Sequence, residues 1–444
     1  MDKKNVVGLP QLRFVSELVG HLRTAYEHPN RKLFLDDLLI ALLLAFFNPV
    51  VRSLRGVEDA SQMPGINQHL TIDALRRSTT SDAMNLFDPD LLLPLIHDLR
   101  ARVSPRQADA TDGTLRGLLN RLIAFDGTFF RTASDVAWAL CERHASRLRG
   151  RVRLNLHLSV RDGVPTGVSV AGKDDPGEPA ALLDHVEAGQ VVVADRGCFS
   201  HDTVHGLLKR RVDFVLRLQS GVRCDVSAQR VLTQADRDAG VVSDQTVLLT
   251  GFKNSHAPTP LRLVTIRPAR PSTRPATPKR PRATGAVDAG EASSIDAAAP
   301  DASSINDTAP DASRIGVTSD EPSALRLLTS IQDEPAHAWI IGQVYRRRWD
   351  IELFFRWLKT CARWEHLICQ SSNGMLMQFY VALIGTLLLA ASTGRKPDRY
   401  SFNLMAMAAA GLGSIDDALA ILQRRHAERD RDRQQRLSRN QKPS

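Results

Sequence analysis

Cysteine is scarce in this chain, with five residues among 444, and none of them forms a C-x2-C pair. No spacing of histidine and cysteine matches a zinc site. The sequence therefore predicts neither a disulfide framework nor a structural zinc ion. It favours reduced thiols in a cytoplasmic protein.

A secretory or membrane-spanning segment is also missing from the pattern. The first residues, Met1–Val6, are polar and charged where a secretory signal would be apolar. The longest apolar run, from Met375 to Ala391, is interrupted by Gln378 and is shorter than a typical span. We interpret this run as a buried helix and expect no membrane partner.

Positive charge is unevenly distributed along the chain. The formal net charge is +9. Residues 1–110 carry 13 Lys+Arg against 13 Asp+Glu, whereas residues 345–444 carry 17 against 9. If a polyanion such as nucleic acid is the partner, this charge favours its binding to the last hundred residues.

One stretch in that basic region places charged side chains on a common stripe. Residues 345–359 read YRRRWDIELFFRWLK. If they form a single helix at about 100° per residue, four side chains share an arc of roughly 60°: Tyr345, Arg348, Glu352 and Lys359. Asp350 projects about 140° away. Taken alone, the Arg348/Glu352 spacing is more often a surface ion pair.

Two aspartates follow apolar strands upstream. Leu122–Phe125 precedes Asp126-Gly-Thr, and Val191–Ala194 precedes Asp195-Arg-Gly. Taken singly, each aspartate is more often a turn or cap residue. Three carboxylates that met would form an oxygen-donor set of the kind that Mg²⁺ prefers.

Together these three motifs resemble the D-G-[ST], D-R-G and Y-x2-R-x3-E-x6-K motifs of DDE transposases of the insertion-sequence-four type. The resemblance extends from about Leu119 to Leu389. It implies an enzyme that cuts DNA and joins 3′-OH ends to target DNA by two-metal-ion chemistry. Three residues are the expected catalytic groups and ligands of two Mg²⁺ ions, or Mn²⁺ in their place: Asp126, Asp195 and Glu352. Three others are expected to hold DNA: Tyr345, Arg348 and Lys359.

The same resemblance implies double-stranded DNA as the partner, both as element ends and as target, and a homodimer as the active complex. It places the protein in the bacterial cytoplasm, on the nucleoid when bound to DNA. Two alternatives stay open. One is an RNase H-like nuclease without strand transfer, and the other is a catalytically silent DNA-binding derivative.

The order of expected elements matches an α/β RNase H-like core, a mixed sheet flanked by helices. Strands are predicted at Leu122–Phe125, Val152–Leu158 and Val164–Val170, followed by a helix at Pro179–Val186 and a strand at Val191–Ala194. In that fold the first and fourth strands lie side by side. Asp126 and Asp195 would then be neighbours.

We divide the chain into six parts: an all-helical, end-binding region (1–112), the first part of the core (113–218), a β-rich insertion (219–266), a disordered low-complexity linker (267–323), the second part of the core (324–395) and a basic tail with a role in dimerisation (396–444). The linker repeats Ala-Ser-Ser-Ile, with Ala-Ser-Arg-Ile as the third copy, at a period of ten residues. Residues 219–330 contain no tryptophan to stack on a flipped base. This absence disfavours excision through a DNA hairpin.

Overall fold

The computed structural model describes residues 33–47, 51, 53–67, 73–103, 112–132, 136–144, 147–219, 221–249, 259–267, 324–332, 336–360, 368–394, 398–409, 412 and 415–440. Its strands are β1 (Leu122–Thr132), β2 (Leu140–His144), β3 (Arg147–Ser159), β4 (Val164–Ala171), β5 (Val191–Ala194), β6 (Asp213–Arg217), β7 (Cys224–Gln229), β8 (Val241–Leu249), β9 (Leu261–Ile266) and β10 (Leu325–Thr329). The helices before the sheet are α2 (Leu35–Phe47), α3 (Leu54–Ser61), α4 (Pro64–Asn67), α5 (Arg77–Leu86), η2 (Pro89–Leu92), α6 (Leu93–Arg102) and α7 (Gly113–Asn120). Those within and after it are α8 (Glu178–Ala181), η3 (Arg196–Cys198), α9 (His201–Lys209), α10 (Gln234–Asp238), α11 (Ala338–Arg346), α12 (Trp349–Thr360), α13 (Ser372–Thr393), α14 (Arg399–Ala409) and α15 (Ile415–Asn440).

The described strands form one mixed sheet in the order β2-β3-β1-β5-β6-β10-β9-β8-β7, with β4 paired to β3. Strand β1 is antiparallel to β3 and parallel to β5, and β5 is parallel to β6. The strands predicted to be first and fourth are β1 and β5, so their predicted pairing is confirmed. Strand β2 was not predicted, because its Leu-Cys-Glu-Arg-His sequence has no strand-like alternation.

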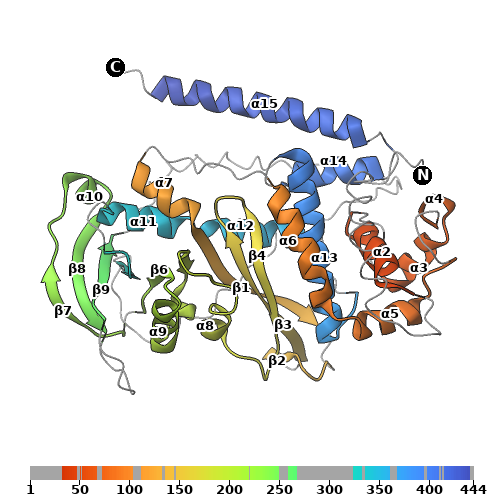
Figure 1. The fold of residues 1–444 in the computed structure, drawn as a ribbon, viewed down its shortest axis with the longest axis horizontal. Coiled ribbons are helices and arrows are strands. Elements are labelled where there is room, and N and C mark those ends of the chain that lie inside the picture. The colour runs from red at the N-terminus through yellow and green to blue at the C-terminus, as the bar shows by residue number, and fades with distance from the viewer. Residues whose placement is uncertain are drawn as a thin grey trace, which may run out of the picture.

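Helices cover both faces of this sheet (Figure 1). Along β1, Ile123 and Phe125 join a cluster with α8 and α9, whereas Ala124 joins the larger cluster with α11, α12 and α13. This alternation follows from the two-residue period of a strand. A mixed sheet flanked by helices fits the predicted RNase H-like core.

Helix α13 is a core helix. It is long and apolar enough to cross a membrane, but 89% of its apolar window is buried inside the protein. It packs against α2, α6 and strand β4. The amide nitrogen of Gln378, which interrupts the apolar run, donates to the carbonyls of Cys369 and Gly374 at 3.1 and 3.0 Å. The predicted buried helix is confirmed.

The strands of the predicted β-rich insertion continue the core sheet. Strand β9 pairs with β10, and β10 pairs with β6. Leu325 lies opposite Ile266, so the chain leaves the sheet at β9 and re-enters it in the neighbouring strand. Residues 268–323, nearly all of the predicted linker, lie outside the described residues. At the C-terminus, α15 runs along one side of the molecule (Figure 1).

Candidate active site

The two aspartates lie where β1 and β5 separate. Ala124 of β1 is opposite Val193 of β5 in a parallel pair. Asp126 and Asp195 each follow these paired residues by two positions, so they project from the same edge of the sheet. The carboxyl ends of parallel strands are where open α/β sheets usually bind ligands.

The sequence predicted that this strand would end at Phe125, but β1 extends further. It continues to Thr132 because β3 supplies partners as far as Gly150. The aspartate of the D-G-T motif is therefore a strand residue rather than a turn residue. The continuation places Thr128 on the same side of β1 as Asp126.

Arg348 joins two of the three predicted acids. Its Nη1 donates to Oδ2 of Asp126 at 3.3 Å, and its Nη2 donates to Oε1 of Glu352 at 2.5 Å. The Arg348 side chain is only 14% exposed, so both ion pairs are largely shielded from water. One guanidinium thus brings Asp126 of β1 and Glu352 of α12 to a common point.

Asp195 is joined to the same helical segment through Tyr345. The Tyr345 hydroxyl donates to Oδ1 of Asp195 at 3.1 Å. Arg217, from the end of β6, approaches the same oxygen at 3.5 Å. Near the other end of α12, Lys359 donates to the Thr128 hydroxyl at 2.8 Å. All six predicted site residues therefore make contacts at this edge of the sheet.

The prediction of a single helix over residues 345–359 is wrong. Helix α11 ends at Arg346 and α12 begins at Trp349. The amides of Arg347 and Arg348 donate to the carbonyls three residues back, at 3.1 and 3.0 Å, which tightens the turn. Two carboxylates in the first turn of α12 stabilise its new N-terminus. Asp350 pairs there with Arg347 at 3.3 Å, whereas Glu352 bonds to Arg348.

The two aspartates have opposite pKa shifts. Burial raises the pKa of Asp126 to about 6, against the lowering effect of Arg348, and the charges of Glu178 and Glu352 add to the increase. Burial alone would also raise the pKa of Asp195. However, the Arg196 amide, the two guanidinium groups and the Tyr345 hydroxyl hold it below its ordinary value. Two acids with separated pKa values are typical of functional sites.

This shift predicts a pH effect on stability without metal. Between pH 4 and 6 the folded protein binds more protons at Asp126 than the unfolded chain does. The free energy of unfolding should therefore fall by roughly 2 kcal/mol as pH rises through this window. Asp126→Asn removes the titrating group. Urea denaturation in EDTA at pH 4.5 and 7 should show wild type losing stability relative to this variant, and a constant difference would contradict the prediction.

Glu178, a fourth acid at the site, was missed by the sequence analysis. A Cβ on Gly127 would lie 2.5 Å from Glu178 Oε1, and one on Gly197 would lie 3.1 Å from Oε2. The carboxylate therefore fits between the glycines of the D-G-T and D-R-G motifs. Those glycines were the available signal, since they permit a close approach. Arg217 was also missed, because its strand position carries no motif. The contact of Thr128 with Lys359 was missed as well, although Thr128 is the last residue of the D-G-T motif.

The chemistry of these donors fits a divalent ion that prefers oxygen ligands. As the side chains lie, no group of three His, Cys, Asp or Glu residues in the described part of the chain is close enough to hold an ion. The Arg348 guanidinium already binds Asp126 and Glu352. An ion held by these carboxylates would compete with Arg348 for them.

His157, on β3 beside β1, lies in the core. Its ring is 1% exposed, and its Nε2 lies 2.9 Å from the carbonyl of Leu182. Burial lowers the pKa of His157 to about 3, so the ring is neutral at pH 7. This environment suits packing rather than proton transfer.

Comparison with known proteins identifies the family of the region that carries the site. The model of a family described as "Transposase DDE domain" matches residues 118–388. These residues include all three acids and the Tyr345–Lys359 segment. The chain is also 25% identical over 205 residues to "Putative transposase y4zB" of Sinorhizobium fredii (strain NBRC 101917 / NGR234). That alignment covers 46% of this chain and 43% of the relative, so the chain spans less than half of the relative's length.

Proposed function

Because the chain belongs to the transposase DDE domain family, we propose that it is a transposase of the insertion-sequence-four type. It binds the ends of its element, cleaves DNA and joins the freed 3′-OH ends to target DNA. The catalytic groups in this proposal are Asp126, Asp195 and Glu352. The observation that best supports them is the network in which Arg348 contacts Asp126 and Glu352, while Tyr345 contacts Asp195.

The reaction needs an activated oxygen nucleophile and stabilisation of the leaving oxygen. Two Mg²⁺ ions, or Mn²⁺ in their place, would supply both functions when held by the three carboxylates. In the first step water attacks the phosphodiester at the 3′ end of the element. In the second step the freed 3′-OH attacks a phosphodiester of the target, and the displaced oxygen leaves as a new 3′-OH.

The neighbouring residues hold the strand in this proposal. Arg348 offers a planar fork that fits phosphate oxygens, and Lys359 offers a point charge. The Tyr345 hydroxyl is a donor that burial and Asp195 keep protonated, since they raise its pKa to about 12. When the carboxylates bind ions, Arg348 and Tyr345 can turn from them to DNA phosphates. Lys359, which donates to the Thr128 hydroxyl, would exchange that contact for a phosphate.

The other expectations follow from the same proposal. Double-stranded DNA serves as both element end and target, and a homodimer pairs the two ends. The basic charge of residues 345–444 suits this partner. We expect the protein to act in the bacterial cytoplasm, on the nucleoid when bound to DNA.

A cleavage and joining assay tests the proposal against its alternatives. Purified protein is incubated with Mg²⁺, labelled DNA that carries the ends of its own element, and an unlabelled target plasmid. A transposase yields nicks at the 3′ ends and labelled plasmid. Nicks without joined product would identify an RNase H-like nuclease. Binding without cutting would identify the silent derivative.

Lys359→Met should weaken binding of element-end DNA by about 10-fold and reduce the slope of log affinity against log salt by about one, because one phosphate contact is lost. Fluorescence anisotropy at several salt concentrations measures both quantities. Lys209→Met is the matched control, since Lys209 is an exposed lysine in the last turn of α9. That turn leads into the start of β6, at the opposite edge of the sheet. Equal effects of both variants would show that Lys359 does not form a specific contact with DNA.

A further inference from the structure

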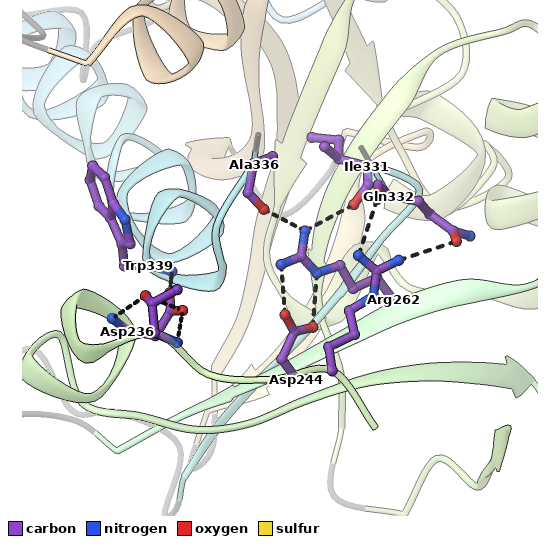
Figure 2. Close-up of polar contacts among 9 residues, drawn as sticks. Asp236, Asp244, Arg262, Ile331, Gln332, Ala336 and Trp339 are labelled. Carbon is purple, nitrogen blue, oxygen red and sulfur yellow. Dashed lines mark hydrogen bonds and ion pairs between the residues drawn. The ribbon is translucent and has the colours of Figure 1, made fainter. Parts of the chain in front are cut away.

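The chain that leads into α11 is held at three backbone groups by side chains from the predicted insertion. Figure 2 shows this cluster, which we call the brace. It consists of Arg230, Asp236, Asp244 and Arg262. Arg230, Arg262 and Asp236 contact the backbone of Gln332, Ala336 and Trp339, respectively, all shortly before or at the start of α11. Asp244 accepts from Arg262. The brace therefore fixes the point from which α11 extends toward the candidate active site.

Arg262 and Asp244 form the buried centre of the brace. Their side chains are 3% and 4% exposed, and Arg262 donates to both carboxylate oxygens of Asp244 at 2.8 and 2.7 Å. The remaining Nη1 of Arg262 donates to the carbonyl of Ala336 at 2.6 Å and approaches that of Ile331 at 3.5 Å. A buried guanidinium needs partners for its donors. Here the partners include the backbone before α11.

Asp236 provides the N-terminal cap that α11 does not supply itself. The N-cap residue, His337, makes no side-chain capping bond. Instead, Oδ1 of Asp236 accepts from the Trp339 amide at 2.9 Å. Its Oδ2 accepts from the amide of Thr233 at 2.9 Å as part of the capping box of α10. One carboxylate thus ties α10 to α11 and places negative charge at a helix N-terminus, where it stabilises the helix.

Helix α11 also lies close to β9. A Cβ on Gly342 would lie 2.7 Å from Cδ1 of Ile266. One turn further along, Tyr345 reaches Asp195, and the tight turn after α11 sets Arg348 between Asp126 and Glu352. Because a helix transmits the position of its start to its end, a shift at Trp339 displaces Tyr345 and Arg348.

We propose that Arg262 and Asp236 are positioning residues for the reaction: they fix the start of α11 and thereby hold Tyr345 on Asp195 and Arg348 between Asp126 and Glu352. This role rests on the proposed transposase function. In this proposal the strands β8 and β9 contribute to the active site by holding the helix that carries Tyr345.

The position of Tyr345 can be read without any DNA. The chain has four tyrosines, so ¹³C labelling of the ring carbon that bears the hydroxyl gives a simple NMR spectrum, in which Tyr345→Phe identifies the Tyr345 signal. In Arg262→Met and in Asp236→Ala we expect this signal to move toward its position in Asp195→Ala, which removes the acceptor of the Tyr345 hydroxyl, while the other tyrosine signals stay. Arg326→Met is the matched control. It removes a guanidinium that donates to the carbonyl of Val222 from the adjacent strand β10, and it should leave the Tyr345 signal unchanged.

The same variants are then tested for nicking of element-end DNA at saturating DNA. We expect a rate lower by about 10- to 100-fold, as for a small misplacement of catalytic groups, with unchanged DNA affinity. If Arg262→Met does not fold, as judged by circular dichroism, Asp236→Ala decides. A folded variant with an unmoved Tyr345 signal would overturn the proposal. If wild type itself does not nick DNA, the proposed function fails, and the NMR result still decides whether the brace positions Tyr345.

Discussion

Replacing any one of Asp126, Asp195 or Glu352 by its amide is expected to lower the rate of DNA cleavage by about 1,000-fold or more, with little change in DNA affinity. The amide keeps the size of the side chain but removes the negative charge that binds a cation. Because Arg348 and Tyr345 can still donate to the amide oxygen, each variant should keep its fold. Single-turnover cleavage and a gel-shift assay on the same DNA measure the two quantities.

Asp350→Asn is the matched control for Glu352→Gln. Both acids lie in the first turn of α12, yet Asp350 pairs with Arg347 and Glu352 with Arg348. We expect Asp350→Asn to cleave at nearly the wild-type rate. An equal loss of activity at both positions would mean that the first turn of α12 acts as a whole and would remove the specific role of Glu352.

Arg348→Met should produce the second large effect. The guanidinium is 14% exposed and contacts two carboxylates, so its loss without metal should lower the free energy of unfolding by about 1–3 kcal/mol at pH 7. The pKa of Asp126 should rise further, because Arg348 is the main charge that lowers it. Cleavage should fall by about 100-fold or more, since a donor to the phosphate is lost.

Added Mg²⁺ distinguishes this account from simple loss of a salt bridge. In wild type an ion competes with Arg348 for Asp126 and Glu352, whereas in Arg348→Met it does not. Mg²⁺ should therefore raise the thermal midpoint of the variant more than that of wild type, as differential scanning fluorimetry can show. Arg347→Met, which removes a 46% exposed partner of Asp350, should respond like wild type. A variant that gains less from Mg²⁺ than wild type would contradict competition at these carboxylates.

The parts of the fold that could be predicted are those fixed by local pattern. A run of three valines and an alanine is buried on both faces of β5, and the alternating Val152–Leu158 segment lies within β3. Parallel pairing of β1 and β5 then brings Asp126 and Asp195 to one edge without further information. The proximity of the aspartates was predictable for this reason.

The arrangement of the Tyr345–Lys359 segment was only partly predictable. The helical wheel grouped Tyr345, Arg348, Glu352 and Lys359 on one side, and all four do contact the edge of the sheet. However, these four residues lie on two helices, α11 and α12, and the turn between them, whereas the helical wheel assumed a single helix. Arg348, which follows the end of α11, bonds to Asp126 of β1, 222 positions away along the chain, and no local pattern indicates that contact.

Contacts between distant segments could not be predicted from the sequence. Glu178 lies against two glycines that are 70 positions apart, from Gly127 to Gly197. Arg262 bonds to carbonyls about 70 positions away along the chain. No periodicity indicates such pairs, because they depend on how the strands are ordered in the sheet. That order places β9 and β10 side by side despite the long segment between them.

The most direct test of the central claim is the location of a divalent ion. Crystals of the protein with element-end DNA, grown with Mn²⁺, can be measured at a wavelength where manganese scatters anomalously. We expect anomalous density in contact with the carboxylates of Asp126, Asp195 and Glu352, with Arg348 turned away from at least one of its two carboxylate partners. Manganese bound elsewhere, with Arg348 still joined to Asp126 and Glu352 in the presence of DNA, would contradict the claim that these three acids form the catalytic centre.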